Sequence, residues 1–207
     1  MTDYFNRKGF PSVDIIGLEG AIGSVLRFVG EDFKYDKGHL KAREGLMETP
    51  KRVAKMYGEL LVGYDQDPKD IMTIFDSDGY DQMVILKNIE MYSLCEHHLL
   101  PFYGKAHVAY IPNDKIIGIS KLARLVDIFS KRLQIQERIG QQVTQAIVDY
   151  LDPRGAACII HADHLCMRMR GVGKQNSIMV TSSLKGVFLE KTNFGLAARQ
   201  ELMQLIN

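Results

Sequence analysis

Residues 83–111 read MVILKNIEMYSLCEHHLLPFYGKAHVAYI, and this stretch decides the fold class. Met83 to Leu94 is rich in branched and long apolar residues, which is typical of a β-strand. From Lys105 to Ile111 the side chains alternate with a period of two, which predicts a second strand. The polar segment 95–98 lies between the two strands, so we expect it at a strand end or in the adjoining loop.

Downstream of this stretch the periodicity changes from helix to strand. Apolar residues three and four positions apart predict amphipathic helices over Leu122–Phe129 and Ile135–Tyr150. Two further strands are expected at Ala156–Ala162 and Ser177–Leu184, and a last helix at Phe194–Ile206. Paired strands separated by paired helices predict an α+β fold with antiparallel hairpins rather than a repeating βαβ chain.

The chain before this region is helical in pattern. The periodicity from Asp14 to Val29 predicts a helix weakened by three glycines, and Thr49 is expected to cap a stronger helix with Pro50 at its first position. Two other segments are expected to be a loose arm and an acidic loop, residues 1–12 and 65–79. The sequence therefore predicts an N-terminal helical region, residues 1–80, and a second domain, residues 81–207.

The composition is that of an ordinary globular protein, with 46% apolar and 25% charged residues among 207. A net charge of +1 gives no sign of a broad nucleic-acid or membrane-binding surface. Three cysteines are too few for a disulfide scaffold and fit reduced thiols in a cytosol. No apolar run approaches the roughly 18–20 residues that span a bilayer, and the N-terminus lacks a secretory signal. We expect a cytoplasmic protein without nucleic-acid or membrane partners.

Two short segments, residues 95–98 (CEHH) and 164–166 (HLC), carry the strongest metal-ligand candidates. Cys95 and His98 have a spacing that lets both side chains reach one ion, and Cys166 would be a third ligand. Two thiolates and one imidazole suit Zn²⁺. Three protein ligands would leave a fourth position for water, whose pKa zinc lowers to about 7. We therefore expect one zinc ion per chain, at a catalytic site.

His97 and His164 would remain beside this ion, and a histidine has a pKa suited to proton transfer near neutral pH. The alternative is a closed structural site with one of these histidines as fourth ligand, and spacing alone leaves the two interpretations nearly level. The spare histidines and nearby basic residues favour catalysis. Cys158 lies in an apolar run and is expected to be a small buried side chain.

No phosphate-binding loop of the G-x4-G-K-[ST] type is present, so scattered basic residues would have to hold a phosphorylated ligand. The candidates form three closely spaced pairs: Arg52 and Lys55, Lys121 and Arg124, and Arg168 and Arg170. Each one taken alone is more often a solvated surface residue. Arg170 gains weight because it follows Cys166 closely, and Lys121 because it follows Ser120 at a helix start.

Gln136-Glu137-Arg138 is a polar triplet between the two predicted helices. A carboxylate can accept two N–H bonds from the edge of a purine. Sequence chemistry alone nevertheless favours a Glu137 that is simply exposed.

Residues 93–102 (SLCEHHLLPF) resemble the signature of the GTP cyclohydrolase I family. Further stretches resemble the same family: 43–46 (REGL), 48–55 (ETPKRVAK), 118–124 (GISKLAR), 136–138 (QER) and 164–172 (HLCMRMRGV). The resemblance implies a tunnelling fold, an antiparallel four-stranded sheet with two helices on one face, here preceded by an N-terminal helical region. It also implies that GTP and water give 7,8-dihydroneopterin triphosphate and formate, the first step of folate or pterin biosynthesis.

The resemblance implies a role for each matching residue. The zinc ligands would be Cys95, His98 and Cys166, and the proton-transfer residues His97 and His164. Ser120 would lie near the ribose, and Glu137, with Gln136 beside it, would anchor guanine. The triphosphate contacts would be Lys121, Arg124, Arg170, Arg52 and Lys55. His161 departs from the family pattern, which has an acidic residue at this position in many members.

The resemblance further implies a ring-shaped homo-oligomer, a decamer of two stacked pentamers. The open edges of a four-stranded sheet and the wide separation of the basic pairs favour sites shared between chains. The main alternative function is a non-catalytic zinc- or purine-binding module of the same fold. A nitrile reductase of this fold lacks the CEHH and HLC set, and a zinc nucleobase deaminase needs H-x-E with P-C-x-x-C, which this chain lacks.

Overall fold

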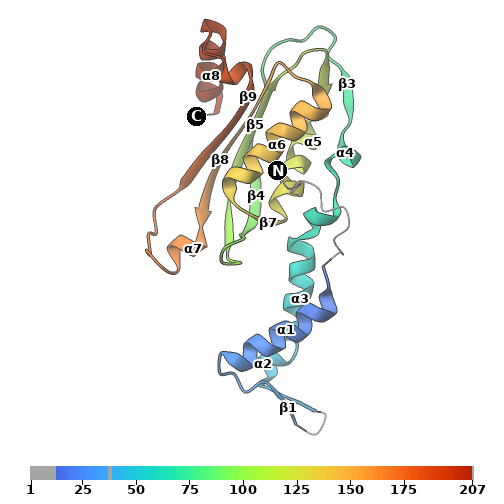
Figure 1. Ribbon diagram of the computed structural model, residues 1–207, viewed down its shortest axis with the longest axis vertical. Helices are drawn as coiled ribbons and strands as arrows, with labels where there is room; N and C mark the ends of the chain where they lie inside the picture. The colour runs from blue at the N-terminus through green and yellow to red at the C-terminus, as the bar shows by residue number, and fades with distance from the viewer. Residues whose placement is uncertain (1–12, 37–38, 207) are drawn as a thin grey trace. The chain divides into compact units, whose positions relative to one another are not determined.

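The computed structural model describes residues 13–36 and 39–206. The described chain forms two compact units, the first ending at Asp65 and the second beginning at Gln66 (Figure 1). The arm expected over residues 1–12 lies outside the described residues.

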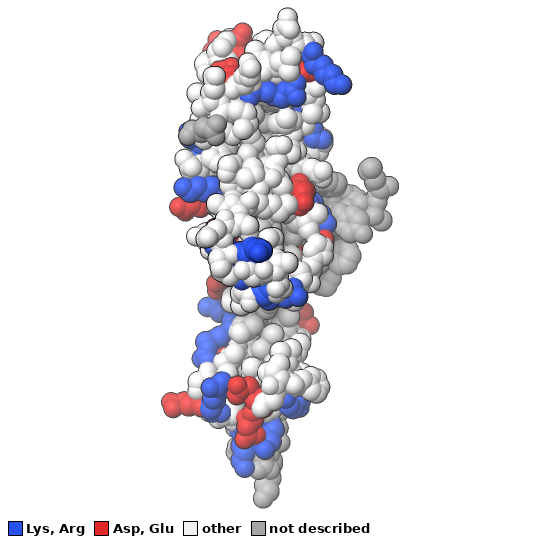
Figure 2. Space-filling model, turned by 90° about the vertical axis from the view of Figure 1, so that its left-hand side faces the viewer, with Lys and Arg blue, Asp and Glu red and all other residues white. Residues whose placement is uncertain are grey.

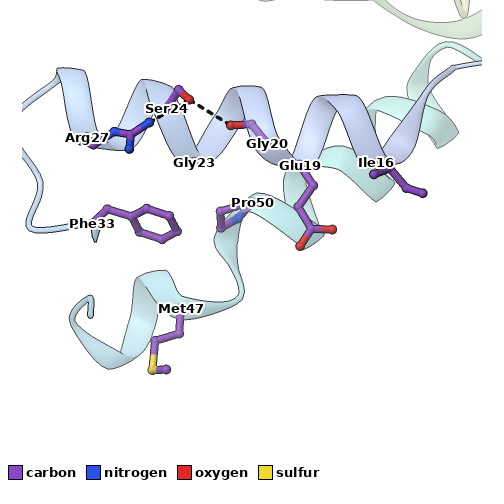
Figure 3. A pocket seen from close by; sticks show the side chains of 9 residues that line it. All are labelled: Ile16, Glu19, Gly20, Gly23, Ser24, Arg27, Phe33, Met47 and Pro50. Atoms are coloured by element: carbon purple, nitrogen blue, oxygen red, sulfur yellow. Dashed lines mark hydrogen bonds between the residues drawn. The ribbon is translucent and has the colours of Figure 1, made fainter. Parts of the chain in front are cut away.

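The first unit is built mainly of helices: α1 (Ile15–Phe28), β1 (Lys34–Asp36), β2 (His39–Lys41), α2 (Glu44–Met47), α3 (Thr49–Leu60) and the 3-10 turn η1 (Val62–Asp65). The Asp14 carboxylate caps α1 by accepting a hydrogen bond from Gly17 N at 2.9 Å. Beside α1 lies a hollow of about 380 Å³, whose lining includes Phe33, Met47 and Pro50 (Figure 3). Gly23 leaves room for the Phe33 ring, because a Cβ there would lie 3.2 Å from it.

The expected cap of α3 is wrong by one residue. Glu48 occupies the N-cap position without a side-chain cap, and Thr49 is already helical, with its hydroxyl donating to Gly45 O at 3.1 Å. The physical reason is that α2 runs almost directly into α3, so Glu48 ends one helix and begins the next. Pro50, expected at the first helical position, is therefore the second residue of the helix and still lies in its first turn.

The second unit contains a five-stranded sheet in the order β7-β4-β5-β8-β9. Four of its strands are antiparallel neighbours: β4 (Val84–Cys95), β5 (Pro101–Ile111), β8 (Gly155–His164) and β9 (Met179–Gly186). The fifth, β7 (Leu133–Gln134), adds two residues in parallel beside the end of β4. The α+β class is confirmed, and β7 is an addition to the expected four strands.

Helices α5 (Ile119–Ser130) and α6 (Gln136–Leu151) cover one face of this sheet (Figure 1). Alternate side chains of β5, such as Val108 and Tyr110, pack among the buried residues of these helices. The side chains between them, such as Ala109, instead pack in a second core with η2 (Val187–Leu189) and α8 (Asn193–Ile206). The period of two along β5 therefore divides the apolar residues between two layers.

Two short elements lie in the segment expected to be an acidic loop, α4 (Pro68–Ile71) and β3 (Ile74–Asp76). Two more lie where the sequence predicted no helix or strand, or none of that kind: β6 (Lys115–Ile117) and α7 (Leu165–Arg168). β3 pairs with β6, and this pairing joins the segment expected to be an acidic loop to the second unit. Elements of three or four residues are too short to show a periodicity, which explains why they were missed.

The surface carries no single dominant charge on the face shown in Figure 2, where acidic and basic side chains are interspersed among uncharged ones. Among residues 13–36 and 39–206, no helix has the length and apolar character to cross a membrane.

Candidate metal centre and active site

Cys95 is the last residue of β4, and the chain turns tightly after it to enter β5. The Cys95 carbonyl accepts hydrogen bonds from the N–H groups of His98 and Leu99 at 3.2 and 2.8 Å. Cys95 N donates to Leu100 O at 2.9 Å. Leu99 has a φ of 54°, a left-handed conformation that a leucine adopts at some cost in energy. This turn brings the side chains of Cys95 and His98 together.

Cys166 reaches the same end of the sheet because β5 lies between β4 and β8. The register pairs Leu94 with Pro101 and Phe102 with His164, so the end of β4, the start of β5 and the end of β8 lie together. Directly after His164, α7 makes a single turn that carries Cys166. The two segments that the sequence singled out therefore meet.

One ligand atom each of Cys95, His98 and Cys166 lies within 4.8 Å of the others. Cys95 Sγ is 3.7 Å from His98 Nδ1. Sulfur and nitrogen ligands at about 2.0–2.3 Å from one tetrahedral ion are about 3.3–3.8 Å apart. The three side chains are therefore close enough together to hold one metal ion.

The electrostatics of this group also favour a cation. Burial raises the pKa of the Cys166 thiol, and the neighbouring Cys95 raises it further. Two thiols placed this close together ionise poorly unless a positive charge lies between them.

His97 borders the group with an exposed ring. Its Nδ1 lies 3.9 Å from Cys95 Sγ, and its Nε2 lies 3.9 Å from Glu96 Oε1. The rings of His97 and His98 are 6.2 Å apart and nearly perpendicular, at 76°. His97 is 64% exposed in its side chain, so solvent reaches it directly.

His164 is held on two sides. Its ring stacks on Phe102 with centroids 4.6 Å apart and an angle of 3° between planes. Its Nε2 lies 2.9 Å from Gln136 Oε1. Burial lowers the pKa of His164, and the carboxylates of Glu137 and Asp163 partly oppose this. Because the ordinary pKa is about 6.5, the ring is mainly neutral at pH 7.

Gln136 is almost completely buried, at 1% exposure, and its amide is fully engaged. Its Nε2 donates to three acceptors at 2.9, 3.1 and 3.0 Å, namely Ile160 O, Met179 O and Thr181 Oγ1. These contacts orient the amide, so that its oxygen faces His164 and the histidine Nε2 is the donor.

Glu96, between the two ligands of the turn, forms an ion pair with Arg138 of α6. Arg138 Nη1 and Nη2 donate to Glu96 Oε2 and Oε1 at 2.5 and 3.1 Å. The hydrogen bond from Arg138 lowers the pKa of the Glu96 carboxyl. The Glu96 backbone N–H also donates to Gln134 O at 3.0 Å, which ties the turn to β7.

Glu137 lies in the first turn of α6 with an exposed side chain. Its charge raises the pKa of His164, which places it near this histidine. Arg170 is exposed, and its charge lowers the pKa of Cys166, so it also lies near the group. Arg168 instead forms an ion pair with Asp163.

The candidate substrate contacts on α5 lie far from the metal-ligand candidates of the same chain. Ser120 and Lys121 begin this helix, whereas its other end leads into β7, where Gln134 pairs with Cys95. Ten residues of helix from Ser120 to Ser130 span about 15 Å at ~1.5 Å per residue. Ser120 and Lys121 therefore lie at the end of α5 remote from Cys95 of the same chain, and Arg124 follows about one turn later.

Arg52 and Lys55 lie on α3 in the first unit, where both have local partners. Arg52 Nη2 donates to Gly45 O at 2.9 Å and to Thr49 Oγ1 at 3.2 Å. Lys55 Nζ is 3.9 Å from Glu59 Oε1, and both side chains are largely exposed. Their expected contact with a triphosphate stays a prediction.

Other titratable groups lie away from this centre. Cys158 is buried as expected, and burial raises the pKa of its thiol to about 12. His107 is 8% exposed and accepts a hydrogen bond from Asn88 N at 3.4 Å. Its ring is 5.5 Å from that of His161.

The sequence did not indicate the roles of Phe102, Glu96 and Arg138. For Glu96 the sequence carried a weak indication of an ion pair, because a partly buried carboxylate between two ligand candidates needs a positive partner. The partner could not be identified without the fold.

The comparisons with known proteins agree with one another. The family model described as GTP cyclohydrolase I matches residues 18–207. GTP cyclohydrolase 1 of Wolinella succinogenes is 50% identical over 174 residues, covering 84% of this chain and 89% of that protein. GTP cyclohydrolase 1 of Leptospira biflexa is 52% identical over 191 residues, covering 91% and 97%. That of Carboxydothermus hydrogenoformans is 47% identical over 195 residues, covering 94% and 95%. With a family model that spans most of its length and relatives that share about half of its residues, this chain belongs to the GTP cyclohydrolase I family.

Proposed function

We propose that this chain is a zinc-dependent GTP cyclohydrolase I, which converts GTP and water to 7,8-dihydroneopterin triphosphate and formate as the first step of folate or pterin biosynthesis. The observation that carries the proposal is the group of Cys95, His98 and Cys166 with His164 and His97 beside it. The names of relatives that share about half of the sequence support the same activity. Three unpaired cysteines favour a reducing compartment, so we place the enzyme in the cytoplasm.

Cys95, His98 and Cys166 would hold one zinc ion per chain. Two thiolates and an imidazole match the ligand preference of zinc, and three protein ligands leave one coordination position open. When bound, zinc acts as a Lewis acid that makes water nucleophilic near neutral pH, which hydrolysis at C8 of the purine requires.

His164 and His97 act as proton carriers in this proposal. His164 is mainly neutral and has its Nε2 proton directed at Gln136, so Nδ1 is the atom that accepts and returns a proton. His97 has an exposed ring and can exchange protons with solvent. Both groups serve the ring-opening and rearrangement steps, which need acid and base.

The substrate contacts are assigned by chemistry and by the family. Glu137 offers two carboxylate oxygens to the N–H groups of guanine, and its position near His164 supports this role. Ser120 would lie near the ribose. The triphosphate would be bound by Arg170, Lys121 and Arg124, with Arg52 and Lys55 as further contacts.

We further propose that the second unit has the tunnelling fold and assembles into a ring, a decamer of two stacked pentamers with shared sites. The four antiparallel strands with α5 and α6 on one face support the fold. The outer position of β9 leaves a strand edge that a neighbouring chain can pair with. The distance of Ser120 and Lys121 from Cys95 along α5 supports a site built from more than one chain.

The assay that tests the activity is incubation of the zinc-loaded protein with GTP. We expect one formate per GTP consumed, with the new absorbance of a pterin. Binding of GTP without turnover would favour the alternative, a non-catalytic zinc- or purine-binding module. Light scattering tests the assembly, with an expected mass several-fold above the 23.4 kDa of one chain.

A further inference from the structure

The first turn of α6 contacts both halves of the metal centre through two residues. Gln136 contacts His164 at the end of β8, and Arg138 contacts Glu96 in the turn after β4. We propose that Gln136 and Arg138 are positioning residues: Gln136 acts on the reaction through His164, and Arg138 acts on metal binding through Glu96. The assignment for Gln136 rests on the proposed function, whereas the assignment for Arg138 rests on the metal group alone.

The hydrogen bonds of Gln136 leave it no capacity to bind a purine. A glutamine amide has two N–H donors and one carbonyl oxygen. The donors already serve three acceptors from β8 and β9, and the oxygen accepts from His164. At 1% exposure, the side chain could contact guanine only by giving up these bonds and leaving buried polar groups unpaired. The family resemblance assigns Gln136 to the substrate, and the geometry points to His164 instead.

The contact with Gln136 determines which nitrogen of His164 carries the proton. Because Gln136 Oε1 can only accept, the neutral ring keeps its proton on Nε2 and leaves Nδ1 as the basic atom. The Phe102 ring, stacked at 4.6 Å, restrains the plane of the imidazole. One contact at the face of the ring and one at its edge thus define its orientation, and the edge contact defines its tautomer, as hydrogen-bonded partners do for histidines in metal sites.

Arg138 performs the corresponding task for the turn that carries Cys95 and His98. Its two N–H groups bind both oxygens of Glu96, a geometry that restrains the carboxylate in position and in plane. Glu96 lies between the two ligand residues, so restraining it restrains both. The Cys95 Sγ to His98 Nδ1 distance of 3.7 Å, suited to a shared ion, is the arrangement that this ion pair helps to maintain.

α6 is a suitable base for both contacts because it is anchored in the core. Ile139 and Val143, which follow the first turn, are fully buried. The side chains of residues 136 and 138 point in different directions, because two positions correspond to more than half a turn of a helix with 3.6 residues per turn. One rigid helical turn therefore relates the β8 segment to the β4 segment.

The experiment for Arg138 measures zinc affinity by competition with a chromophoric chelator. We expect the affinity of Arg138→Met to be about 10-fold below wild type, the lower end of the cost of losing a direct partner of a metal ligand, because Arg138 acts on the ligand turn through Glu96. Arg138→Lys keeps the positive charge but cannot form the bidentate contact, so it should recover part of the lost zinc affinity. Arg27→Met, an exposed arginine on α1, is the control and should bind zinc normally. An Arg138→Met protein that binds zinc as tightly as wild type would overturn the assignment.

The experiment for Gln136 separates kcat from KM. We expect Gln136→Met to lower kcat about 10–100-fold, with KM for GTP and zinc affinity within about twofold of wild type. Gln145→Met, a half-buried glutamine on the same helix, is the matched control and should retain kcat. A rise in KM with unchanged kcat would assign Gln136 to the substrate and overturn the proposal, as would normal values of both constants.

A second measurement keeps the test independent of turnover. Solid-state NMR of ¹⁵N-histidine-labelled, zinc-loaded protein should show His164 as the Nε2–H tautomer in the wild type, and this signal should change in Gln136→Met. If the wild type releases no formate, the proposed function fails, while the tautomer and the zinc competition still decide the roles of Gln136 and Arg138. An unchanged His164 tautomer in Gln136→Met would contradict the role proposed for Gln136.

Discussion

The two ends of the helical layer differ in how complete they are within one chain. Cys95, His98 and Cys166 lie together near the end of α5 and the start of α6. In the first turn of α6, Gln136 contacts His164 and Arg138 contacts Glu96. At the start of α5, Ser120 and Lys121 lie about 15 Å away along the helix. We call the first region the metal end and the second the phosphate end.

The difference between the metal end and the phosphate end indicates which part of the proposed chemistry a single chain can supply. The side chains proposed for metal binding and proton transfer lie together within the second unit. The charges proposed to bind phosphate are not gathered in one place in a single chain, which is why we propose that neighbouring chains share the site. Variants at either end should lose activity when assembled alone, whereas mixing a metal-end variant with a phosphate-end variant should restore part of the activity.

The largest expected effect comes from Cys166→Ser at the metal end. Loss of a thiolate ligand should remove zinc and lower formate release by about a thousandfold or more, because the metal supplies several kcal/mol to the transition state. Metal analysis and the formate assay check this on the same sample. Cys158→Ser, which alters a buried thiol outside the centre, is the control and should keep its zinc. Full zinc occupancy in Cys166→Ser would remove this residue from the ligand set.

The next effect is expected for His164→Ala. This variant should bind zinc normally, and its kcat should fall about 10²–10⁴-fold, the usual contribution of one acid–base group. Zinc content and single-turnover kinetics are the measurements, with intermediates after ring opening as the informative products. If zinc content collapses instead, His164 is a ligand and the centre is a closed one.

A smaller effect should follow at the phosphate-binding residues. Arg170→Ala should weaken binding of GTP about 10–100-fold, since a charged hydrogen bond contributes about 1.5–3 kcal/mol. Guanosine, which lacks phosphate, should bind the variant and the wild type alike. Equal losses for the two ligands would show that Arg170 does not recognise phosphate.

Mixed assemblies test the division between the two ends. Inactive Cys166→Ser chains and inactive Arg124→Ala chains, dissociated and reassembled together, should regain part of the activity if one site uses Cys166 and Arg124 from different chains. A fully active monomer would refute the shared site.

The smallest effect concerns His107, which lies outside both ends. Burial, and then the nearby charge of His161, lower the pKa of His107 in the folded protein. A histidine with a lowered folded pKa stabilises the fold above its unfolded pKa of about 6.5 and loses this contribution as the pH falls through the folded pKa. Chemical unfolding should therefore show that wild type loses more stability than His107→Gln as the pH falls below about 6.5. Parallel pH profiles would contradict this.

Sequence reasoning found the long elements and the metal-ligand candidates that the structure brings together, and both successes have a physical reason. Strands and helices of eight or more residues, such as β4 and α6, repeat their periodicity often enough to be recognised. Cysteine and histidine carry metal chemistry in any context, so Cys95, His98 and Cys166 could be proposed before the fold. The cap of α3 was misplaced because the preceding helix α2, four residues long, gives no periodic signal.

Roles that depend on partners from distant segments could not be predicted. Arg138 and Glu96 are 42 residues apart, and the bidentate contact between them follows only from the fold, in which β7 pairs with the end of β4 and leads directly into α6. Gln136 presented the same difficulty, because its burial between β8 and β9 decides whether the amide can reach a substrate.

Zinc K-edge X-ray absorption of the purified protein tests the central claim most directly. We expect two sulfur neighbours at about 2.3 Å, one imidazole nitrogen at about 2.0–2.1 Å and one further light atom from solvent. Two sulfurs with two imidazoles would show a closed structural site, and any other number of sulfurs would contradict the pairing of Cys95 with Cys166.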